Sequence, residues 1–236
     1  MKEQFIRTAG LLGEAALARL QNARVAIFGI GGVGGYVAEA LARTGVGALD
    51  LIDSDTVSES NINRQVIALH STVGMQKTAA ARARLLDISP TLKIVTHDLF
   101  FLPETADRFD FSLYDYVVDA VDTVSAKLEL VRRANAAGVP IISAMGTGNK
   151  LDPTALRVTD IYKTEGCPLA RTVRSICRRE GIKKLKVVYS PEPTKGATYA
   201  ENGRHAPASA VFVPAAAGLT IASAVVRDLC ADFSKT

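Results

Sequence analysis

A glycine-rich segment follows the first strongly apolar run of the chain. Residues 25–35 read VAIFGIGGVGG, in which Gly29, Gly31 and Gly34 fit the spacing G-x-G-x-x-G before a predicted helix. Glycines let the backbone come close to a phosphate, and the N–H groups at the start of a helix carry partial positive charge. We therefore expect Gly29, Gly31, Gly32 and Gly34 to bind a nucleotide.

The segment after the second apolar run adds acidic, amide and basic side chains to the same region. Asp53 ends that run, where an acid usually binds a ribose hydroxyl. It is followed by Asn61, Arg64, Gln65 and Lys77. Two fixed positive charges and two amides suit an enzyme that acts on the phosphates, because negative charge develops there during phosphoryl or nucleotidyl transfer. The pattern favours ATP consumption over NAD binding.

Two further acids end the apolar run YDYVVDA and its continuation. Asp119 and Asp122 lie where an open α/β sheet places its ligands. A carboxylate beside ATP phosphates is a natural anchor for Mg²⁺, which prefers one or two carboxylates together with phosphate oxygens. The alternative is that Asp122 caps the next helix. For Asp119 we expect a structural or supporting role.

These side chains require a sheet whose strands end at one edge. Apolar runs predict strands at 25–28, 48–53, 93–97, 114–119 and 140–144. Helices are predicted at 13–20, 33–43, 75–87 and 124–137. This alternation predicts an α/β, Rossmann-like fold with a mostly parallel, doubly wound sheet and helices on both faces.

The remainder of the chain forms a predicted C-terminal extension. After a core at about 21–150 come a basic insert and a mobile loop at about 151–208, and a C-terminal helix at about 214–232. Within the insert we expect a helix near 169–180 and a strand at LKVVYS. Residues 191–208 are rich in proline, glycine and polar residues, which predicts the loop. We expect residues 1–236 to form a single domain.

Composition points to a globular protein with an ordinary core. The chain has 236 residues, of which 48% are hydrophobic, enough to bury a substantial core. No apolar run approaches the roughly 18–20 residues of a membrane span, and the N-terminus lacks a signal-peptide pattern, so we expect a cytoplasmic protein without a membrane partner. Cys167, Cys177 and Cys230 form no C-x-x-C pair, which argues against a disulfide framework and a four-cysteine zinc site.

Positive charge gathers in one stretch, although the formal net charge is only +4. Residues 171–186 contain one acid, Glu180, against seven bases: Arg171, Arg174, Arg178, Arg179, Lys183, Lys184 and Lys186. Such clustering is typical of surfaces that bind a phosphate backbone. The alternative is a solvated helix face.

Several motifs together resemble the ThiF/MoeB/HesA superfamily, the fold of ubiquitin-activating enzymes. They are GIGGVGG, DSDTVSESNINRQ, Lys77 and VVDAVDT. Further segments resemble the TcdA (CsdL) branch, the tRNA threonylcarbamoyladenosine dehydratases; these segments are residues 7–20, 63–74, 151–164 and 167–190.

The resemblance implies an activity. ATP would activate the threonyl carboxylate of threonylcarbamoyladenosine in tRNA as an acyl-adenylate, and a nitrogen of the same modification would then close a ring and release AMP. The cofactors implied are ATP and Mg²⁺. The implied partners are the anticodon arm of tRNA, held by the basic stretch 171–186, a second copy of the chain, and a possible sulfur-relay protein.

The resemblance also implies roles for individual residues. Asp53 would bind the ribose, Gln65 would orient the loop, and Asp122 would be the metal-linked catalytic acid. Asn61, Arg64 and Lys77 are carried over as phosphate contacts. The following position, usually Asn in the family, is Thr123. Arg7 would enter the ATP site of the other subunit of a homodimer, although an arginine near a chain terminus is more often solvated.

Two other functions stay open at this point. The first is adenylation of the C-terminus of a ubiquitin-like sulfur-carrier protein, against which the missing zinc cysteines and the basic insert argue. The second is an NAD-dependent oxidoreductase. Cys167 has basic neighbours, but cyclisation by dehydration needs no thiol nucleophile, so we do not expect it to be catalytic.

Overall fold

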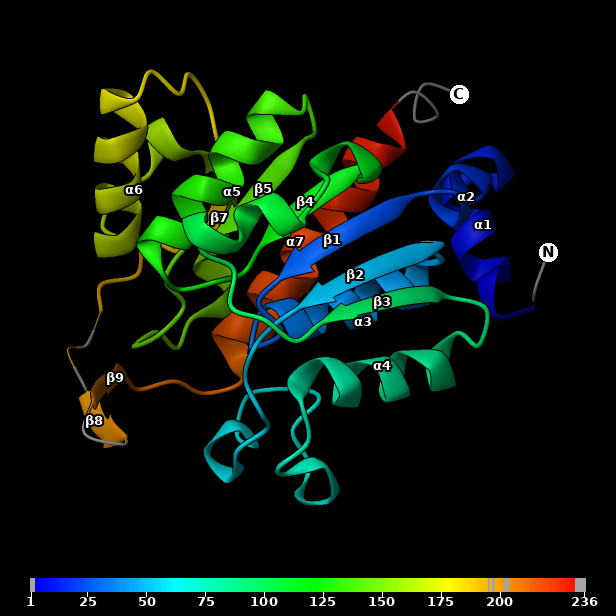
Figure 1. The fold of residues 1–236 in the computed structure, drawn as a ribbon, viewed down its shortest axis with the longest axis horizontal. Coiled ribbons are helices and arrows are strands. Elements are labelled where there is room, and N and C mark those ends of the chain that lie inside the picture. The colour runs from blue at the N-terminus through cyan, green and yellow to red at the C-terminus, as the bar shows by residue number, and fades with distance from the viewer. Residues whose placement is uncertain (1–2, 195, 197, 202–203, 232–236) are drawn as a thin grey trace.

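The computed structural model describes residues 3–194, 196, 198–201 and 204–231, which build one seven-stranded sheet and a separate hairpin (Figure 1). The strands of the large sheet are β1 (Arg24–Phe28), β2 (Ala48–Ile52), β3 (Lys93–His97), β4 (Tyr116–Asp119), β5 (Ile141–Ala144), β6 (Arg157–Asp160) and β7 (Lys186–Tyr189). Their order is β3-β2-β1-β4-β5-β7-β6. Only the pair β6–β7 is antiparallel. The predicted α/β class with a mostly parallel sheet is confirmed.

Helices cover both faces of this sheet. They are α1 (Ile6–Leu12), α2 (Glu14–Gln21), α3 (Gly34–Thr44), α4 (Lys77–Ile88), α5 (Val124–Ala136), α6 (Pro168–Arg179) and α7 (Phe212–Leu229). Successive residues of a strand point to opposite faces. Val25 and Ile27 therefore pack in one core with α3, α4 and α7, whereas Ala26 and Phe28 pack in the other with α5 and α6.

The strand order reverses between β2 and β4, on the two sides of β1. The loop after β1 and the loop after β4 therefore part at the carboxyl edge of the sheet, which is where such sheets bind ligands. Gly29 begins the first loop and Ala120 the second. The predicted nucleotide loop and the predicted acids thus meet at one topological switch point.

The predicted elements agree with the structure to within two or three residues, except for the loop at 191–208 and for two elements that were not predicted. The predicted loop at 191–208 is wrong in part, because β8 (Thr198–Glu201) and β9 (Arg204–Pro207) form an antiparallel hairpin. The dipeptide Asn202-Gly203, which lies outside the described residues, favours hairpin turns and was the available signal. Helix α1 and strand β6 were not predicted. The C-terminal helix begins at Phe212 rather than near 214 and ends at Leu229.

Helix α7 also corrects the expectation that no apolar run is long enough for a membrane span. Its 18 residues meet the length and composition of one. Half of the helix is buried inside the molecule, where it packs along α3 and against β4–β7. Buried core helices can have the same length and apolar composition, so these two properties are weak indications of a membrane span.

The first two helices lie at the opposite edge of the sheet from the switch point (Figure 1). Phe5, Ala9 and Leu17 form a small core between them, and α2 leads directly into the amino end of β1. Side chains of α1 that leave this core, such as Ile6 and Leu11, are exposed.

Candidate active site

A cavity of about 670 Å³ opens at the carboxyl edge of the sheet. Its wall includes the loops that follow β1 to β5, the starts of α4 and α6, and the segment before α7. Nine predicted site residues line it: Gly29, Gly31, Gly32, Asp53, Asn61, Arg64, Gln65, Lys77 and Asp122. The size suits a small-molecule ligand.

Gly34 is the exception within the predicted glycine loop, because it does not line the cavity. A Cβ atom at Gly34 would lie 1.8 Å from the carbonyl oxygen of Gly29. Gly34 therefore lets helix α3 start directly against the loop. Gly29 has a positive φ of 90°, and a Cβ there would lie 2.7 Å from the carbonyl oxygen of Ala120. By contrast, Gly31 has space for a Cβ, whose nearest neighbour would be Gln65 Nε2 at 3.9 Å.

These contacts separate two kinds of glycine substitution. We expect Gly34→Ala to lower the thermal stability of the protein, because the clash is with backbone. Gly31→Ala should fold normally and weaken ATP binding, since the added methyl group faces the cavity. Gly10→Ala, a helical position with nothing within 4 Å, is the matched control. Thermal unfolding and calorimetric ATP titration measure both effects; unchanged ATP affinity in Gly31→Ala would mean that phosphates do not approach this residue.

Asp53 is fixed by two backbone donors. Its Oδ2 accepts from the N–H of Ile30 at 2.7 Å, and its Oδ1 accepts from the N–H of Asp55 at 2.9 Å. Burial raises the pKa of the Asp53 carboxyl above its ordinary value, although Lys77 and the two N–H groups act in the opposite direction. A carboxylate has about four acceptor positions, so Asp53 can still accept from ligand hydroxyls.

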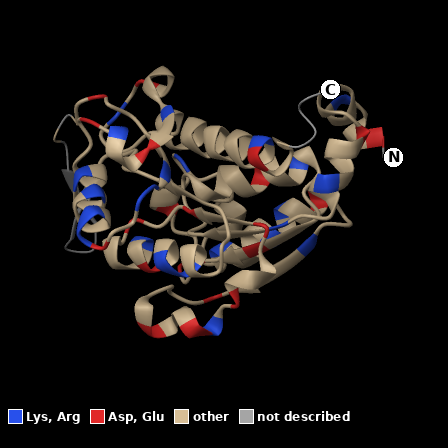
Figure 2. Ribbon diagram, turned by 90° about the horizontal axis from the view of Figure 1, so that it is seen from above, with Lys and Arg blue, Asp and Glu red and all other residues tan. Residues whose placement is uncertain are grey.

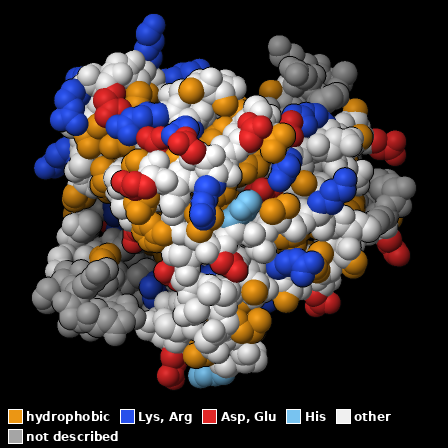
Figure 3. Space-filling model, in the orientation of Figure 1, with side chains coloured by type: hydrophobic (Ala, Val, Ile, Leu, Met, Phe, Trp, Pro, Cys, Tyr) orange, Lys and Arg blue, Asp and Glu red, His pale blue; other side chains and the backbone are white. Residues whose placement is uncertain are grey.

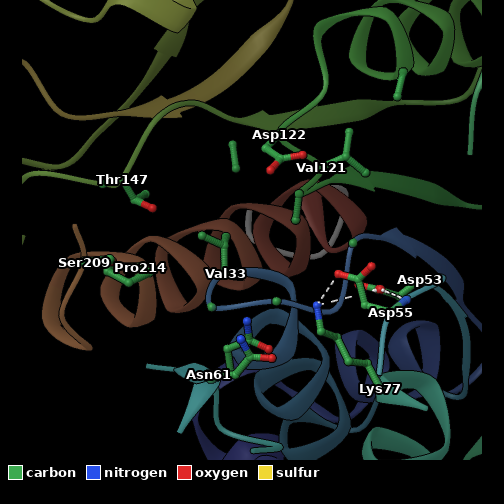
Figure 4. A pocket seen from close by; sticks show the side chains of 18 of the residues that line it. Val33, Asp53, Asp55, Asn61, Lys77, Val121, Asp122, Thr147, Ser209 and Pro214 are labelled. Atoms are coloured by element: carbon green, nitrogen blue, oxygen red, sulfur yellow. Dashed lines mark hydrogen bonds and ion pairs between the residues drawn. The ribbon is translucent and has the colours of Figure 1, made fainter. Parts of the chain in front are cut away.

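Lys77 is the first residue of α4, and its side chain is buried beneath the cavity (Figure 4). Its Nζ lies 2.6 Å from Asp55 Oδ2 and 4.0 Å from Asp53 Oδ1. Asp55 lies in the loop after β2, and its exposed carboxylate pairs with the lysine. Lys77 is thus held at the cavity by an acid that solvent can reach.

The turn at 59–65 presents an amide and a guanidinium to the cavity. Asn61 is buried, and its Oδ1 accepts from the N–H of Ser58 at 3.2 Å. Arg64 Nη1 donates to the carbonyl oxygen of Ser60 at 2.9 Å and to Asn63 Oδ1 at 3.0 Å. Gln65 is buried, and its Oε1 has no partner among the described residues. These bonds hold Arg64 beside Gly32.

Asp122 faces the glycine loop from the other side of the cavity (Figure 4). Its side chain accepts a hydrogen bond from Thr123 Oγ1 at 3.3 Å. The alternative that Asp122 caps the next helix is wrong, because Thr123 is the N-cap of α5 and no side chain caps that helix. An exposed carboxylate opposite the loop is free to bind a cation or a ligand donor.

Comparisons with known proteins agree with this geometry. A family model described as the ThiF family matches residues 5–232. The tRNA threonylcarbamoyladenosine dehydratase of Bacillus subtilis (strain 168) is 40% identical over 247 aligned residues, covering 99% of this chain and 97% of the relative. The chain belongs to the ThiF family.

Other similar proteins differ in how much of this chain they match. The crystal structure of E. coli tRNA N6-threonylcarbamoyladenosine dehydratase, TcdA, in complex with ATP is 33% identical, with a TM-score of 0.89, and the match covers 99% of this chain and 96% of that one. The adenylyltransferase and sulfurtransferase UBA4 of Saccharomyces cerevisiae (strain YJM789) is 33% identical over 161 residues, which cover 68% of this chain but 36% of the relative.

The second half of the cavity was not predicted from the sequence of this ThiF-family chain. Its wall includes Met145–Gly148 after β5, Leu169 in the first turn of α6, and Pro207 and Ser209 before α7. The N–H of Asn149 donates to the carbonyl oxygen of Ala208 at 2.7 Å, and Asn63 Nδ2 donates to that of Ser209 at 2.9 Å. Glycines after a predicted strand, as in SAMGTG, were the only signal for this wall.

Arg7 is absent from the residues that line this cavity. It is exposed on α1, at the edge of the sheet opposite the glycine loop (Figure 1). A role in this cavity of the same chain is therefore excluded by the arrangement of the elements, and only a second chain could bring Arg7 to an ATP site.

Three carboxylates line the cavity: Asp53 is bound by two backbone N–H groups, Asp55 pairs with Lys77, and Asp122 accepts only from Thr123 among the described residues. No group of three or more His, Cys, Asp or Glu side chains that could hold a metal occurs among the described residues. Magnesium in nucleotide sites combines one or two carboxylates with phosphate oxygens. Asp122 opposite the loop therefore fits a magnesium ion that arrives with ATP, and does not fit a resident metal.

Proposed function

We propose that this protein adenylates the carboxylate of threonylcarbamoyladenosine in tRNA and cyclises the modification with net loss of water. The B. subtilis relative named for this dehydration matches nearly the whole of both chains, and a TcdA structure of the same fold was solved with ATP. The proposal is also supported by the cavity, which brings together nine of the residues predicted from the sequence for ATP chemistry.

One structural observation supports the tRNA substrate most directly. Leu169, in the first turn of the basic helix α6, lines the same cavity as Gly31 and Gly32. Lysines and arginines follow along α6 and the turn after it (Figures 2 and 3). An RNA backbone on α6 would therefore place a nucleoside at the entrance to the ATP cavity, because the helix begins there.

The side chains of the cavity can perform the adenylation. The N–H groups at Gly31 and Gly32 would bind phosphate oxygens, and Asp53 would accept from the ribose. Arg64 and Lys77 would stabilise negative charge as the substrate carboxylate attacks the α-phosphate and pyrophosphate leaves. A nitrogen of the modification then attacks the acyl carbon, its C–N bond replaces the acyl–AMP bond, and AMP leaves. Pro207 and Ser209 would limit access of water.

Asp122 would hold the magnesium ion that accompanies ATP. When bound, the ion would add positive charge beside the phosphates. Asp122 lies across the cavity from Asn61 and Lys77 (Figure 4), so cationic groups would surround the phosphates on both sides.

Mass spectrometry of tRNA nucleosides after incubation with enzyme, ATP and magnesium tests the function. We expect threonylcarbamoyladenosine to lose the mass of water in an ATP-dependent reaction. Pyrophosphate exchange that responds to a small carrier protein, and not to modified tRNA, would instead support the alternative of sulfur-carrier adenylation. Tight binding of NADH without ATP binding would support an oxidoreductase.

The basic stretch at 171–186 divides into engaged and free cations. Arg174 Nη1 donates to Thr164 at its carbonyl oxygen (2.8 Å) and its Oγ1 (2.6 Å), and Lys186 pairs with Asp228 at 2.6 Å. Arg178 lies over the ring of Tyr162. Arg171, Arg179, Lys183 and Lys184 are exposed and form no ion pair with any residue that the structure describes. Arg179 is next to Glu180 and acts on its carboxyl group electrostatically, so Arg171, Lys183 and Lys184 are the best candidates for phosphate contacts.

Removal of the free cations should weaken tRNA binding in a salt-dependent way. For the triple variant R171A/K183A/K184A we expect the slope of log affinity against log salt to fall by roughly one unit per lost contact, with ATP affinity unchanged. The matched control R82A/K93A/R227A removes the same charge from α4, β3 and α7. Equal slopes in the variant and wild type would assign the stretch to solvation or to another partner.

The assembly and location of the protein are part of the same proposal. We propose a homodimer, because exposed apolar side chains flank Arg7 on α1 and occur again at Leu69, Val73 and Met75, in the segment between the cavity-lining residues Gln65 and Lys77. A sulfur-relay protein is a possible further partner. The cytoplasm, where tRNA is modified, is the proposed location, without a membrane partner.

A further inference from the structure

A buried ion pair between Lys127 and Asp119 lies directly behind the cavity. Lys127 on α5 is 1% exposed and Asp119 at the end of β4 is fully buried. Lys127 Nζ lies 3.0 Å from Asp119 Oδ1 and 2.9 Å from Oδ2. It also donates to the carbonyl oxygen of Ala144, at the end of β5, at 2.7 Å. Neither side chain lines the cavity.

Each partner of Lys127 is attached to a wall of the ATP cavity. Asp119 Oδ1 accepts from the N–H of Val121 at 3.2 Å, and Val121 and Asp122 line the cavity. Ala144 also lines it and leads into the wall at 145–148. The same β4–α5 loop touches the glycine loop, since a Cβ at Gly29 would meet Ala120. Lys127 thus links the loop after β4 to the loop after β5, and the loop after β4 in turn touches the glycine loop through Ala120.

Stability alone does not account for such a pair. Removal of two charges from water is unfavourable, and well-packed apolar residues of similar volume are often as stabilising as a buried ion pair. What apolar residues cannot supply is a set of directed bonds to a carboxylate and a carbonyl group. Lys127 bonds to the ends of β4 and β5, which lead into the loop that carries Asp122 and into the wall at 145–148.

We propose that Lys127, through Asp119 and the Ala144 carbonyl group, is a positioning residue that fixes Asp122 and the wall at 145–148 against the glycine loop. The proposal rests on the proposed role of Asp122 toward magnesium and ATP. Lys127 itself touches neither, so its effect must appear in the placement of the loop that carries Asp122.

The test removes both charges together, because a single substitution would leave an unpaired charge in the core. We expect the double variant D119L/K127M to be folded, with a melting temperature close to that of the wild type. Two further variants extend the test. D119N/K127M retains an acceptor oxygen for Val121, and R19M/D115L removes an ion pair of 2.8 Å at the amino end of the same strand, as the matched control.

Two measurements distinguish positioning from packing. Binding of a fluorescent ATP analogue should require several-fold more Mg²⁺ in D119L/K127M than in the wild type, with R19M/D115L unchanged. The kcat for adenylate formation should fall between about tenfold and a hundredfold, as expected for a displaced group, and D119N/K127M should recover part of it. Asp122→Ala should show the same defect in Mg²⁺-dependent binding of the ATP analogue. Combining Asp122→Ala with D119L/K127M should increase that defect little.

The possible outcomes separate this inference from the proposed function. Wild-type Mg²⁺ dependence and kcat in folded D119L/K127M would overturn the positioning role. Failure of both double variants to fold would also overturn it, since the pair would then be needed for the structure itself. If wild-type enzyme forms no adenylate with modified tRNA, the proposed function fails, whereas the Mg²⁺ dependence of ATP binding still tests Lys127.

Discussion

Replacement of Asp122 or Arg64 by Ala should lower tRNA-dependent ATP–pyrophosphate exchange by about a hundredfold or more, the usual effect of losing a group that stabilises transition-state charge. The fold should be unaffected. Asp122 is exposed, and its side chain hydrogen-bonds only to Thr123 among the described residues, whereas Arg64 makes two hydrogen bonds within its own turn. Isotope exchange measures the rate, and circular dichroism at rising temperature measures the stability.

Matched controls lie elsewhere on the surface. Asp107, whose side chain is 86% exposed, pairs with Arg133, and Arg82 is exposed on α4. Asp107→Ala and Arg82→Ala should exchange pyrophosphate at the wild-type rate. If Asp122→Ala or Arg64→Ala behaves like these controls, that residue has no part in the adenylation.

The cavity residues at the ends of β1 and β2 could be predicted because their spacing follows from the fold. A buried parallel strand needs a continuous apolar run, and its end is marked by the first polar residue or glycine. Gly29 and Asp53 are such residues. The sheet order then brings the ends of neighbouring strands together, so two residues far apart in the chain are found at one cavity.

The other half of the cavity could not be predicted because nothing local determines it. Pro207 and Ser209 line the cavity because the chain returns past Asn63 and Asn149, which hold it by hydrogen bonds. These contacts join segments far apart in sequence, and a single proline or serine in a sequence does not indicate a binding site. Only the fold of the whole chain positions them.

The pairing and burial of individual charged side chains could not be predicted from the sequence. Arg174 and Arg171 lie on the same helix, yet Arg174 is bonded to Thr164 and Arg171 is not ion-paired within the described chain. Lys127 resembles any helix lysine in sequence and is fully buried beside Asp119. Pairing depends on neighbours in space, so a run of bases in sequence overstates the number available to a partner.

Arg7 should complete the ATP site of a second subunit, so Arg7→Ala should lower pyrophosphate exchange without weakening the fold. An arginine supplied in trans can be worth about a thousandfold or more in phosphoryl chemistry. The structure excludes a role of Arg7 in the cavity of its own chain, because α1 lies at the far edge of the sheet from that cavity. Next to Arg7, the side chains of Ile6 and Leu11 are exposed, which suits contact with another chain.

A mixing experiment tests the arrangement in trans. Chains with Arg7→Ala and chains with Arg64→Ala are each nearly inactive alone. In a mixed dimer, one site keeps its own Arg64 and receives an intact Arg7, whereas the other site lacks both. Random exchange makes about half of the dimers mixed, so the mixture should recover roughly a quarter of the wild-type activity per chain. A mixture no more active than its components, or light scattering that detects only monomer, would show that Arg7 does not act across subunits.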